Sequence, residues 1–465
     1  MERNLLTLAA LLRDRGAKTL GCPGDPAPAP RIGAGPSGSG APTLNAGSSD
    51  VPFQSASPST GTGADPTQRE DPLRIAFFTD TFEPTNDGVA KVTSTLASAL
   101  ARRGHQVTVF TVRSPGLPRS EVRSDGVRIR RFRAVAAPAY PQYRIALTPW
   151  YVPLSPSRFD VVHIHTPGFV GLAGWFAARR WAVPSVGTYH TNLTDLLRGV
   201  GRTGPTQAFF RAWSRFSIDL CRHCDVATAP SDASRLDLLG RTPPVPRREP
   251  RLVPNGVDTE RFRPGIRDPD WRRRLGIGNV PIVLLLGRLT RDKGVDRFLT
   301  AVERLDRERP WFALVVGEGP LRPLLEQRLR PGSDSFDRAR FIGPVLEEEK
   351  PALLAQSQVF VIPSLSDTSS VALLEAMAGG VPSVVSSFGG PAEIARSSSV
   401  GLVVDPRDAD RLAGAISQLL EDPSLARSFS SRGREWVREH ASADRMAREF
   451  VDCYRSVRPT PKSPS

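Results

Sequence analysis

The chain is predicted to be an α/β protein with two doubly wound domains in tandem. Short apolar runs, typical of buried strands, alternate with stretches whose apolar residues recur at helical spacing. Helices of this length between strands indicate right-handed βαβ units and a parallel sheet. The alternation occurs in two separate series, one from residue 74 and one after residue 251. A chain of 465 residues is long enough for two or three domains, each with its own core.

The first series begins with an expected strand at 75–78 and a polar loop that reaches Gly88. A helix is expected over residues 89–100, because its apolar residues recur at helical spacing, and Gly104 ends it. The remaining expected strands lie at 107–110, 161–164, 282–286, 312–316, 359–362, 383–385 and 402–404. Further helices are expected over 295–302, over 321–325 and over the apolar positions from 446 to 457.

Residues 1–72 are predicted to form a disordered low-complexity tail. Gly, Pro, Ser, Ala and Thr dominate residues 17–72, and so few large apolar side chains cannot offset the entropy of ordering. The other boundaries follow from the two series. A first Rossmann-like domain is expected at 73–254, a second at 255–440, and a C-terminal helix at 441–458 that packs back on the first domain.

The formal net charge of +14 implies an anionic partner. The charge is explained either by contact with phosphates, in a nucleotide or on an anionic membrane surface, or by a genome-wide bias toward arginine. Nucleic acid is not expected, because the sequence has no zinc-finger spacing, RNP-like aromatic motif or basic zipper. The sequence contains no run of about 18 apolar residues, so no transmembrane helix is predicted. Cys221 and Cys224 have C-x-x-C spacing without a second pair, so no metal site is predicted, and a reducing cytoplasm is expected.

Ligands of doubly wound sheets bind beyond the carboxyl ends of the strands, so site residues are expected in the loops after strands. Arg288 follows the expected strand at 282–286, and Lys293 precedes the expected helix at 295–302. Two cations beside a helix N-terminus form an anion site, because free N–H groups and the helix dipole add to their charge. In a transferase this site would hold a diphosphate and stabilise it as it leaves. A solvated Arg and Lys beside a turn are the alternative.

The segment 363–378 places two carboxylates near one strand end. Asp367 lies in a loop after the expected strand at 359–362, and Glu375 lies inside an otherwise apolar helix. A charge among apolar residues is costly unless it faces a polar ligand or partner. Glu375 is therefore predicted to bind the ribose hydroxyls of a nucleotide, or else to pair with a buried arginine.

The order and spacing of these motifs resemble the family 4 glycosyltransferases, which have the GT-B fold. An acidic residue, seven intervening residues and a glutamate, here Asp367 and Glu375, look like the family signature. Asp367 followed by Thr368 is most similar to a bacterial group of lipid-directed α-mannosyltransferases and sulfoquinovosyltransferases. The likeness covers about residues 73–458 and includes DVVHIHTP at 160–167, GTYHT at 187–191, PNGVD at 254–258, GRL at 287–289, KG at 293–294 and GGPAEI at 389–394.

The resemblance implies a role for each matching residue. The donor diphosphate would be bound by Arg288 and Lys293, and Glu375 would hold the ribose. Asp367 would hold the transferred sugar and His190 would lie beside its reacting face. Gly88 would let the backbone approach the phosphates. The resemblance also implies retention of anomeric configuration, with no metal and no cofactor beyond the nucleotide-sugar substrate.

Two features of the sequence depart from, or add to, that pattern. The family usually has Phe-Gly where this chain has Ser369 and Ser370. A glycine lets the backbone approach a sugar at positive φ, which serine adopts less readily. Ser369 and Ser370 are still expected at the donor, but the departure leaves open a protein that binds a sugar nucleotide without turnover. His163 and His165 alternate along a strand and are expected to face opposite sides.

The sequence therefore predicts a hexosyltransferase that moves mannose or a similar hexose from GDP-mannose or a UDP-hexose to a lipid or glycan acceptor. It is expected in the cytoplasm, peripheral on the plasma membrane. A soluble enzyme that makes a small glycoside or exopolysaccharide is the second hypothesis. Phe209, Phe210, Trp213 and Phe216 form an aromatic stripe beside two arginines, which fits a surface that rests on anionic lipid. A core-facing helix with a solvated basic edge is the alternative.

Overall fold

A computed structural model of the chain describes residues 71–85, 87–137, 140–147, 159–190, 204–240, 248–266, 268–330, 332 and 337–457. The predicted tail at 1–72 falls almost wholly outside these residues, as do the side chains of Phe209 and Phe210.

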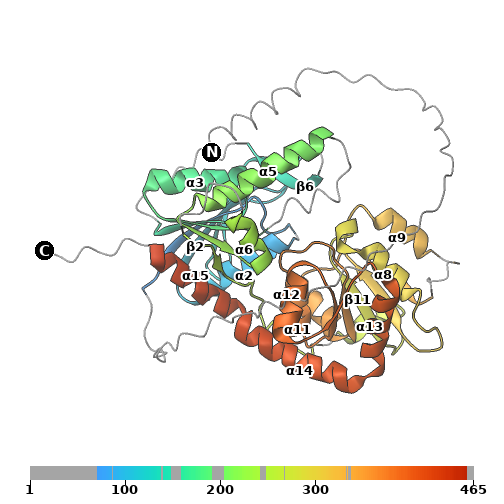
Figure 1. Ribbon diagram of the computed structural model, residues 1–465. Helices are drawn as coiled ribbons and strands as arrows, with labels where there is room; N and C mark the ends of the chain where they lie inside the picture. Colours follow the sequence, from blue (N-terminus) through green and yellow to red (C-terminus); the bar gives the residue numbers. More distant parts are fainter. Residues whose placement is uncertain are drawn as a thin grey trace, which may run out of the picture. The chain divides into compact units, whose positions relative to one another are not determined.

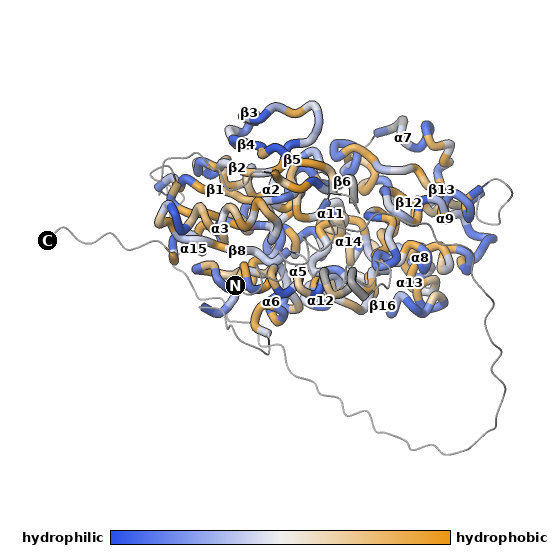
Figure 2. The backbone as a smooth tube through the Cα atoms, turned by 90° about the horizontal axis from the view of Figure 1, so that it is seen from above, coloured by the Kyte–Doolittle hydropathy of each residue, from blue (hydrophilic) through white to orange (hydrophobic). Residues whose placement is uncertain are grey.

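The first sheet has eight strands in the order β10-β9-β8-β7-β1-β2-β4-β3. The strands are β1 (Arg74–Phe78), β2 (Gln106–Val112), β3 (Ser120–Val122), β4 (Arg128–Phe132), β7 (Val161–Ile164), β8 (Ser185–Thr188), β9 (Val226–Ala229) and β10 (Arg251–Leu252). Every pair is parallel except the edge pair β3–β4. The edge strand β3 and its neighbour β4 are largely hydrophilic (Figure 2), which suits an edge exposed to water. The direction of winding reverses between β1 and β7.

The second sheet is all parallel, in the order β13-β12-β11-β14-β15-β16. Its strands are β11 (Ile282–Leu286), β12 (Phe312–Val316), β13 (Ala339–Phe341), β14 (Val359–Ile362), β15 (Ser383–Ser386) and β16 (Leu402–Val404). Winding reverses between β11 and β14, which makes the loops after these two strands the expected ligand site. The prediction of two doubly wound units is confirmed, and every expected strand is present.

Helices cover both faces of the first sheet (Figure 1). One face packs against α3 (Phe169–Trp181) and α5 (Gly204–Arg222), and the other packs against α2 (Gly88–Arg102) and α15 (Ala443–Val457). The two apolar cores alternate along β1: Ile75 and Phe77 face α2 and α15, whereas Ala76 and Phe78 face α3. Because α15 follows the second sheet in the chain, its packing on α2 joins the two halves of the fold.

The second sheet carries its own core, built from nearly continuous apolar strands and the helices on either face. The helices are α8 (Val295–Val302), α9 (Arg322–Arg328), α10 (Lys350–Ala355), α11 (Val371–Ala378), α12 (Gly389–Ser398), α13 (Ala409–Glu421) and α14 (Pro423–His440). A short segment crosses between the halves beside the start of α15. Val257 N donates to Ala441 O, and Ala443 N donates to Val257 O, both at 2.9 Å.

The loops after β11 and β14 are joined backbone to backbone. Leu365 N donates to Asp292 O at 2.7 Å. Gly294 adopts φ +68°, and a Cβ on it would lie 2.1 Å from Pro363 O. Only glycine allows both the left-handed conformation and this approach. The contact fixes Lys293, which precedes Gly294, beside the loop that holds Asp367.

We therefore predict that Gly294→Ala lowers the free energy of unfolding by at least about 1–2 kcal/mol, because an L-residue is strained at this φ and its methyl group meets Pro363. Denaturant titration measures the change. Gly414→Ala is the matched control: Gly414 lies inside α13 with nothing within 4 Å of an added Cβ, so alanine should be neutral or stabilising. Equal stability of Gly294→Ala and the wild type would contradict the argument.

Candidate functional site

A cavity of ≈ 370 Å³ opens at the carboxyl ends of β11 and β14. It is lined from the first sheet's side by the start of α2, by Tyr143 and by His190. Of the residues predicted from sequence, it brings together Gly88, His190, Arg288, Lys293, Asp367, Ser369 and Ser370. Glu375 is not among the lining residues and lies behind them.

The two predicted phosphate-binding cations are held by carboxylates. Lys293 Nζ donates to Asp367 Oδ2 at 2.8 Å, and both side chains are largely shielded, with exposures of 21% and 16%. Arg288 Nη2 lies 3.8 Å from Asp292 Oδ2, and its side chain is 38% exposed. An anion that binds here competes with Asp367 and Asp292 for the same N–H groups. Each of the two cations is therefore paired with a carboxylate that an anionic ligand would have to displace.

Gly88 is the first residue of α2, and its neighbour caps that helix. Ala90 N donates to Asp87 Oδ1 at 2.8 Å, so one free N–H of the first turn is already satisfied. A Cβ at Gly88 would meet nothing within 4 Å, which means that open space adjoins the backbone here. The helix N-terminus at the cavity wall favours a negative ligand group.

The loop that carries Asp367 rests directly on the start of α12. Gly390 N donates to Asp367 O at 2.8 Å. A Cβ on Gly390 would lie 2.4 Å from Thr368 O, so the close approach requires glycine. The Gly389-Gly390 motif therefore supports the Asp367 loop from beneath.

Neither Ser369 nor Ser370, which replace the family's Phe-Gly, has a positive φ. Among the described residues, non-glycine residues with positive φ are Ala182 and Ser399. Ser370 has φ −88° and is the N-cap of α11, where its hydroxyl accepts from Leu373 N at 3.3 Å. The chain begins a helix at this point, and serine is a favourable N-cap.

Hydrogen bonds join the two halves of the fold, one of them at the cavity. Thr368 Oγ1 donates to the backbone oxygen of His190 at 2.7 Å. The carboxylate of Glu393 accepts from Asp232 N and Ala233 N, each at 3.0 Å, at the start of α6 (Asp232–Leu239). Burial raises the pKa of Glu393. These contacts fix the position of His190 relative to the Asp367 loop.

Glu375 is 3% exposed, and its Oε2 has no hydrogen-bond partner within the described residues. Its electrostatic partners are two lysines that line the cavity, Lys91 and Lys350, rather than the arginine that the sequence suggested. Burial lowers the pKa of Lys350 to about 8, aided by the like charge of Lys91. Burial also opposes the charge of Lys91, but the carboxylates of Glu375 and Glu347 outweigh it and raise the pKa.

Sequence reasoning missed Lys91 and Lys350. Lys91 Nζ lies 3.4 Å from Glu347 Oε1, and Lys350 donates to the same carboxylate. The available signal was the run of three glutamates before Lys350, at the start of an apolar helix. Nothing local indicated that a lysine on α2 would meet them.

His163 and His165 do not face opposite sides. Their ring centroids lie 3.8 Å apart, because residues two apart along a strand point to the same face. His165 Nδ1 and His190 Nε2 are 3.2 Å apart, and His163 contacts Tyr454 OH at 2.8 Å. Burial lowers the pKa of His190 to about 4, and burial together with the neighbouring imidazoles lowers the pKa values of His163 and His165 well below the ordinary value.

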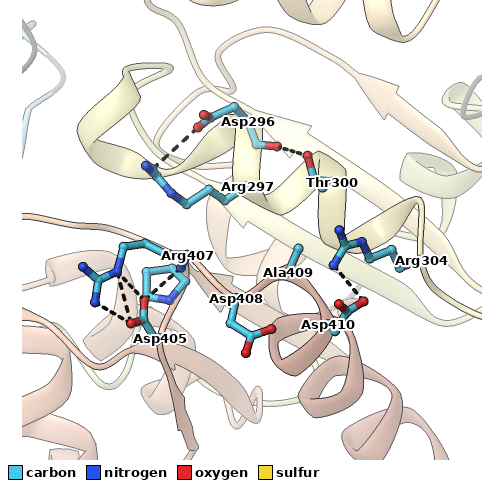
Figure 3. Close-up of a pocket in the computed structure, with 10 residues that line it drawn as sticks. Asp296, Arg297, Thr300, Arg304, Asp405, Arg407, Asp408, Ala409 and Asp410 are labelled. Atoms are coloured by element: carbon cyan, nitrogen blue, oxygen red, sulfur yellow. Dashed lines mark hydrogen bonds and ion pairs between the residues drawn. The ribbon is translucent and has the colours of Figure 1, made fainter. Parts of the chain in front are cut away.

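A second hollow, of ≈ 640 Å³, lies between α8 and the segment that leads into α13 (Figure 3). Its charged side chains pair with one another: Arg407 with Asp405, and Arg304 with Asp410 at 2.7 Å. Both pairs are largely exposed to solvent.

The aromatic stripe on α5 is divided between core and surface. Phe216 is 4% exposed and packs in the core with Leu220. Trp213 is half-buried against Phe169 and Phe216, whereas Arg211 and Arg215 are exposed. Among the described helices, none combines the length and apolar character needed to cross a bilayer.

We predict that the buried imidazoles of His163, His165 and His190 make the protein acid-sensitive. In the unfolded chain an imidazole titrates near ~6.5, so between this pH and about 4 the unfolded state binds protons that the native state does not. The free energy of unfolding then decreases by about 1.4 kcal/mol per imidazole for each unit by which the pH is lowered. Between pH 7 and 5, the wild type should lose about 2 kcal/mol more than His163→Gln, as measured by denaturant titration.

The exposed His440, replaced by Gln in the same way, is the control for that experiment. An identical pH dependence in the wild type and His163→Gln would show that His163 does not remain neutral when buried.

Comparison with known proteins agrees with this architecture. Residues 86–261 match the family described as Glycosyltransferase Family 4, and residues 267–436 match Glycosyl transferases group 1. The chain is 30% identical to a GDP-mannose-dependent alpha-mannosyltransferase of Mycobacterium tuberculosis, over 78% of this chain and 93% of that protein. It is 35% identical to a GDP-mannose-dependent alpha-(1-6)-phosphatidylinositol monomannoside mannosyltransferase of the same species, over 50% of this chain and 62% of that protein.

A solved structure, the sucrose-phosphate synthase of Thermosynechococcus elongatus, superposes with a TM-score of 0.66. It is 24% identical and the match covers 82% of this chain and 98% of that one, so it bears on the fold. The two family matches together span most of the chain, and they meet near the crossing between its two sheets. The chain therefore belongs to the family 4 glycosyltransferases and has the GT-B fold.

Proposed function

We propose that the protein is a retaining mannosyltransferase, or transfers a similar hexose, from a nucleotide-diphosphate donor such as GDP-mannose to a lipid or glycan acceptor. The observation that carries the proposal is the meeting of Arg288, Lys293 and Asp367 at the reversal of the second sheet, opposite His190. A diphosphate and a hexose fit these groups, since the cations lie beside a carboxylate that can accept sugar hydroxyls.

In this mechanism the negative charge that develops on the leaving diphosphate is stabilised by Arg288 and Lys293. No metal is required, because the two cations supply that charge. Asp367 orients the hexose, His190 lies beside its reacting face, and the backbone at Gly88 approaches the phosphates. Glu375 accepts from the ribose once the donor has entered, which gives its unpartnered oxygen a donor.

The lipid acceptor is supported by the relative whose name states that it mannosylates a phosphatidylinositol monomannoside. The exposed Arg211 and Arg215 on α5 would add attraction to an anionic membrane at whose cytoplasmic face the enzyme acts. The alternative of binding without turnover rests on the departure from Phe-Gly at Ser369 and Ser370. Ser370 is the N-cap of α11, and neither residue has a positive φ.

We predict that the purified protein releases nucleotide from one of GDP-mannose, UDP-glucose and UDP-sulfoquinovose, with GDP-mannose expected, when mixed membrane lipids and EDTA are present. Lys293→Ala should lower kcat/KM by about 100-fold or more, because it removes a cation from the leaving group. Arg411→Ala, an exposed cation on α13, is the control and should retain activity.

Donor affinity without release from any donor would replace the proposal with a binding function. Release that survives Lys293→Ala would refute the assignment of the phosphate site. Loss of activity in EDTA that Mg²⁺ restores would refute metal independence.

We predict salt-dependent binding of the protein to vesicles that contain phosphatidylglycerol, and none to pure phosphatidylcholine. An arginine near an anionic surface contributes about 1 kcal/mol, so Arg211→Glu with Arg215→Glu should weaken binding at least about tenfold in a sedimentation assay. Arg434→Glu with Arg438→Glu repeats the same spacing on exposed positions of α14 and is the control. Equal binding by both double variants, or no binding at low salt, would exclude α5 as the contact.

A further inference from the structure

Backbone hydrogen bonds fix the main chain at His190. It follows β8, and the preceding residue is fixed to the sheet because Tyr189 N donates to Thr228 O at 2.9 Å. Its own carbonyl oxygen accepts from Thr368 at 2.7 Å. With the main chain fixed on both sides, the position of the imidazole depends on its two side-chain torsions. A hydrogen-bond partner of the ring determines these torsions.

That partner is His165. Its Nδ1 lies 3.2 Å from His190 Nε2, and the two rings are nearly parallel, with 15° between their planes. His165 is 1% exposed, so water cannot take its place without a rearrangement of the core. The contact therefore selects one orientation of the His190 ring at the wall of the cavity.

His165 is itself immobilised by rings on two sides. Phe77 meets it edge-on, with centroids 4.6 Å apart, and His163 lies against it at 3.8 Å. His163 is fixed in turn by Tyr454 OH at 2.8 Å and Thr188 Oγ1 at 2.7 Å. The line from His190 thus reaches α15, and every member of it is buried.

The same contact couples the protonation of the two rings. Burial keeps His165 and His190 neutral at pH 7, so each ring carries one N–H and one lone pair. A hydrogen bond between His165 Nδ1 and His190 Nε2 needs the N–H on one side and the lone pair on the other. The tautomer of His165 therefore dictates whether the remaining nitrogen of His190 donates or accepts.

We propose that His165 is a positioning residue for the transfer reaction, which sets the orientation and the tautomer of His190 beside the reacting sugar. The proposal rests on the proposed function, in which His190 lies at the reacting face of the hexose. His165 does not line the cavity and acts only through His190. Its loss should therefore affect kcat more than the donor KM, since the residues proposed to bind the donor's diphosphate and ribose are elsewhere.

The test is a double-mutant cycle with a conservative rescue. His165→Leu keeps an apolar side chain of moderate size but offers His190 no partner, and should lower kcat about 10- to 100-fold with the donor KM changed less than about threefold. His165→Asn carries a polar atom on the same Cγ as the lost Nδ1, and should recover at least about half of that loss on a logarithmic scale. In a His190→Gln background, His165→Leu should change kcat less than about threefold.

A readout independent of turnover is the ¹⁵N NMR spectrum of the histidine rings in the full chain. In the wild type His190 should show one neutral tautomer at pH 7, and in His165→Leu a mixture of both. The same factor for His165→Leu in both backgrounds would overturn the proposal, and so would an unchanged His190 tautomer. If the wild type transfers no sugar, the proposed function fails, and the NMR comparison still decides whether His165 sets His190. If His165→Leu does not fold, the wild-type spectrum still decides, because a mixture of both His190 tautomers in the wild type would overturn the proposal.

Discussion

The site depends on the close approach of two loops at the point where winding reverses in the second sheet. The backbone of Gly294 lies against Pro363, in a conformation and at a distance that a side chain would not allow. This contact places Lys293 within 2.8 Å of Asp367, although the two residues belong to different βαβ units. A third segment, the start of α12, then packs beneath Asp367 through Gly390. Three loops that are distant in sequence thus form one surface because glycine lets their backbones touch.

The first sheet supplies the opposite wall by a different means. On this side His190 lines the cavity beside the start of α2, and the buried imidazoles of His165 and His163 behind it reach Tyr454 on α15. The last helix therefore contributes to the position of His190 while it completes the core beside α2. The hydrogen bond from Thr368 to His190 joins this wall to the Asp367 loop at the cavity.

The sequence alone was sufficient for the fold class and for residues whose place follows from a strand end. Arg288, Lys293 and Asp367 follow apolar strands, and a parallel sheet brings all such loops to one edge. The short strands β8 and β9 were not expected, because runs such as VATA and SVGT are too small and weakly apolar to stand out. Lys91 and Lys350 were missed because their partners lie across the fold, where local patterns carry no information. The prediction for His163 and His165 failed for a simpler reason: a spacing of two on a strand means the same face, not opposite faces.

The distribution of charge in the cavity bears on how a donor would be recognised. Among the described residues that line it, Lys91, Arg288, Lys293 and Lys350 are matched in number by Asp87, Asp292, Glu318 and Asp367. The net charge of +14 is therefore not concentrated here, and phosphate recognition has to be local. If Lys293 binds the diphosphate as proposed, its pairing with Asp367 must weaken, because the same ammonium serves both anions. The carboxylate released in this way is the group proposed to accept the hydroxyls of the hexose. Each half of the donor then prepares the site for the other, so a nucleotide without its sugar should leave Asp367 without a partner and bind less tightly than the intact donor.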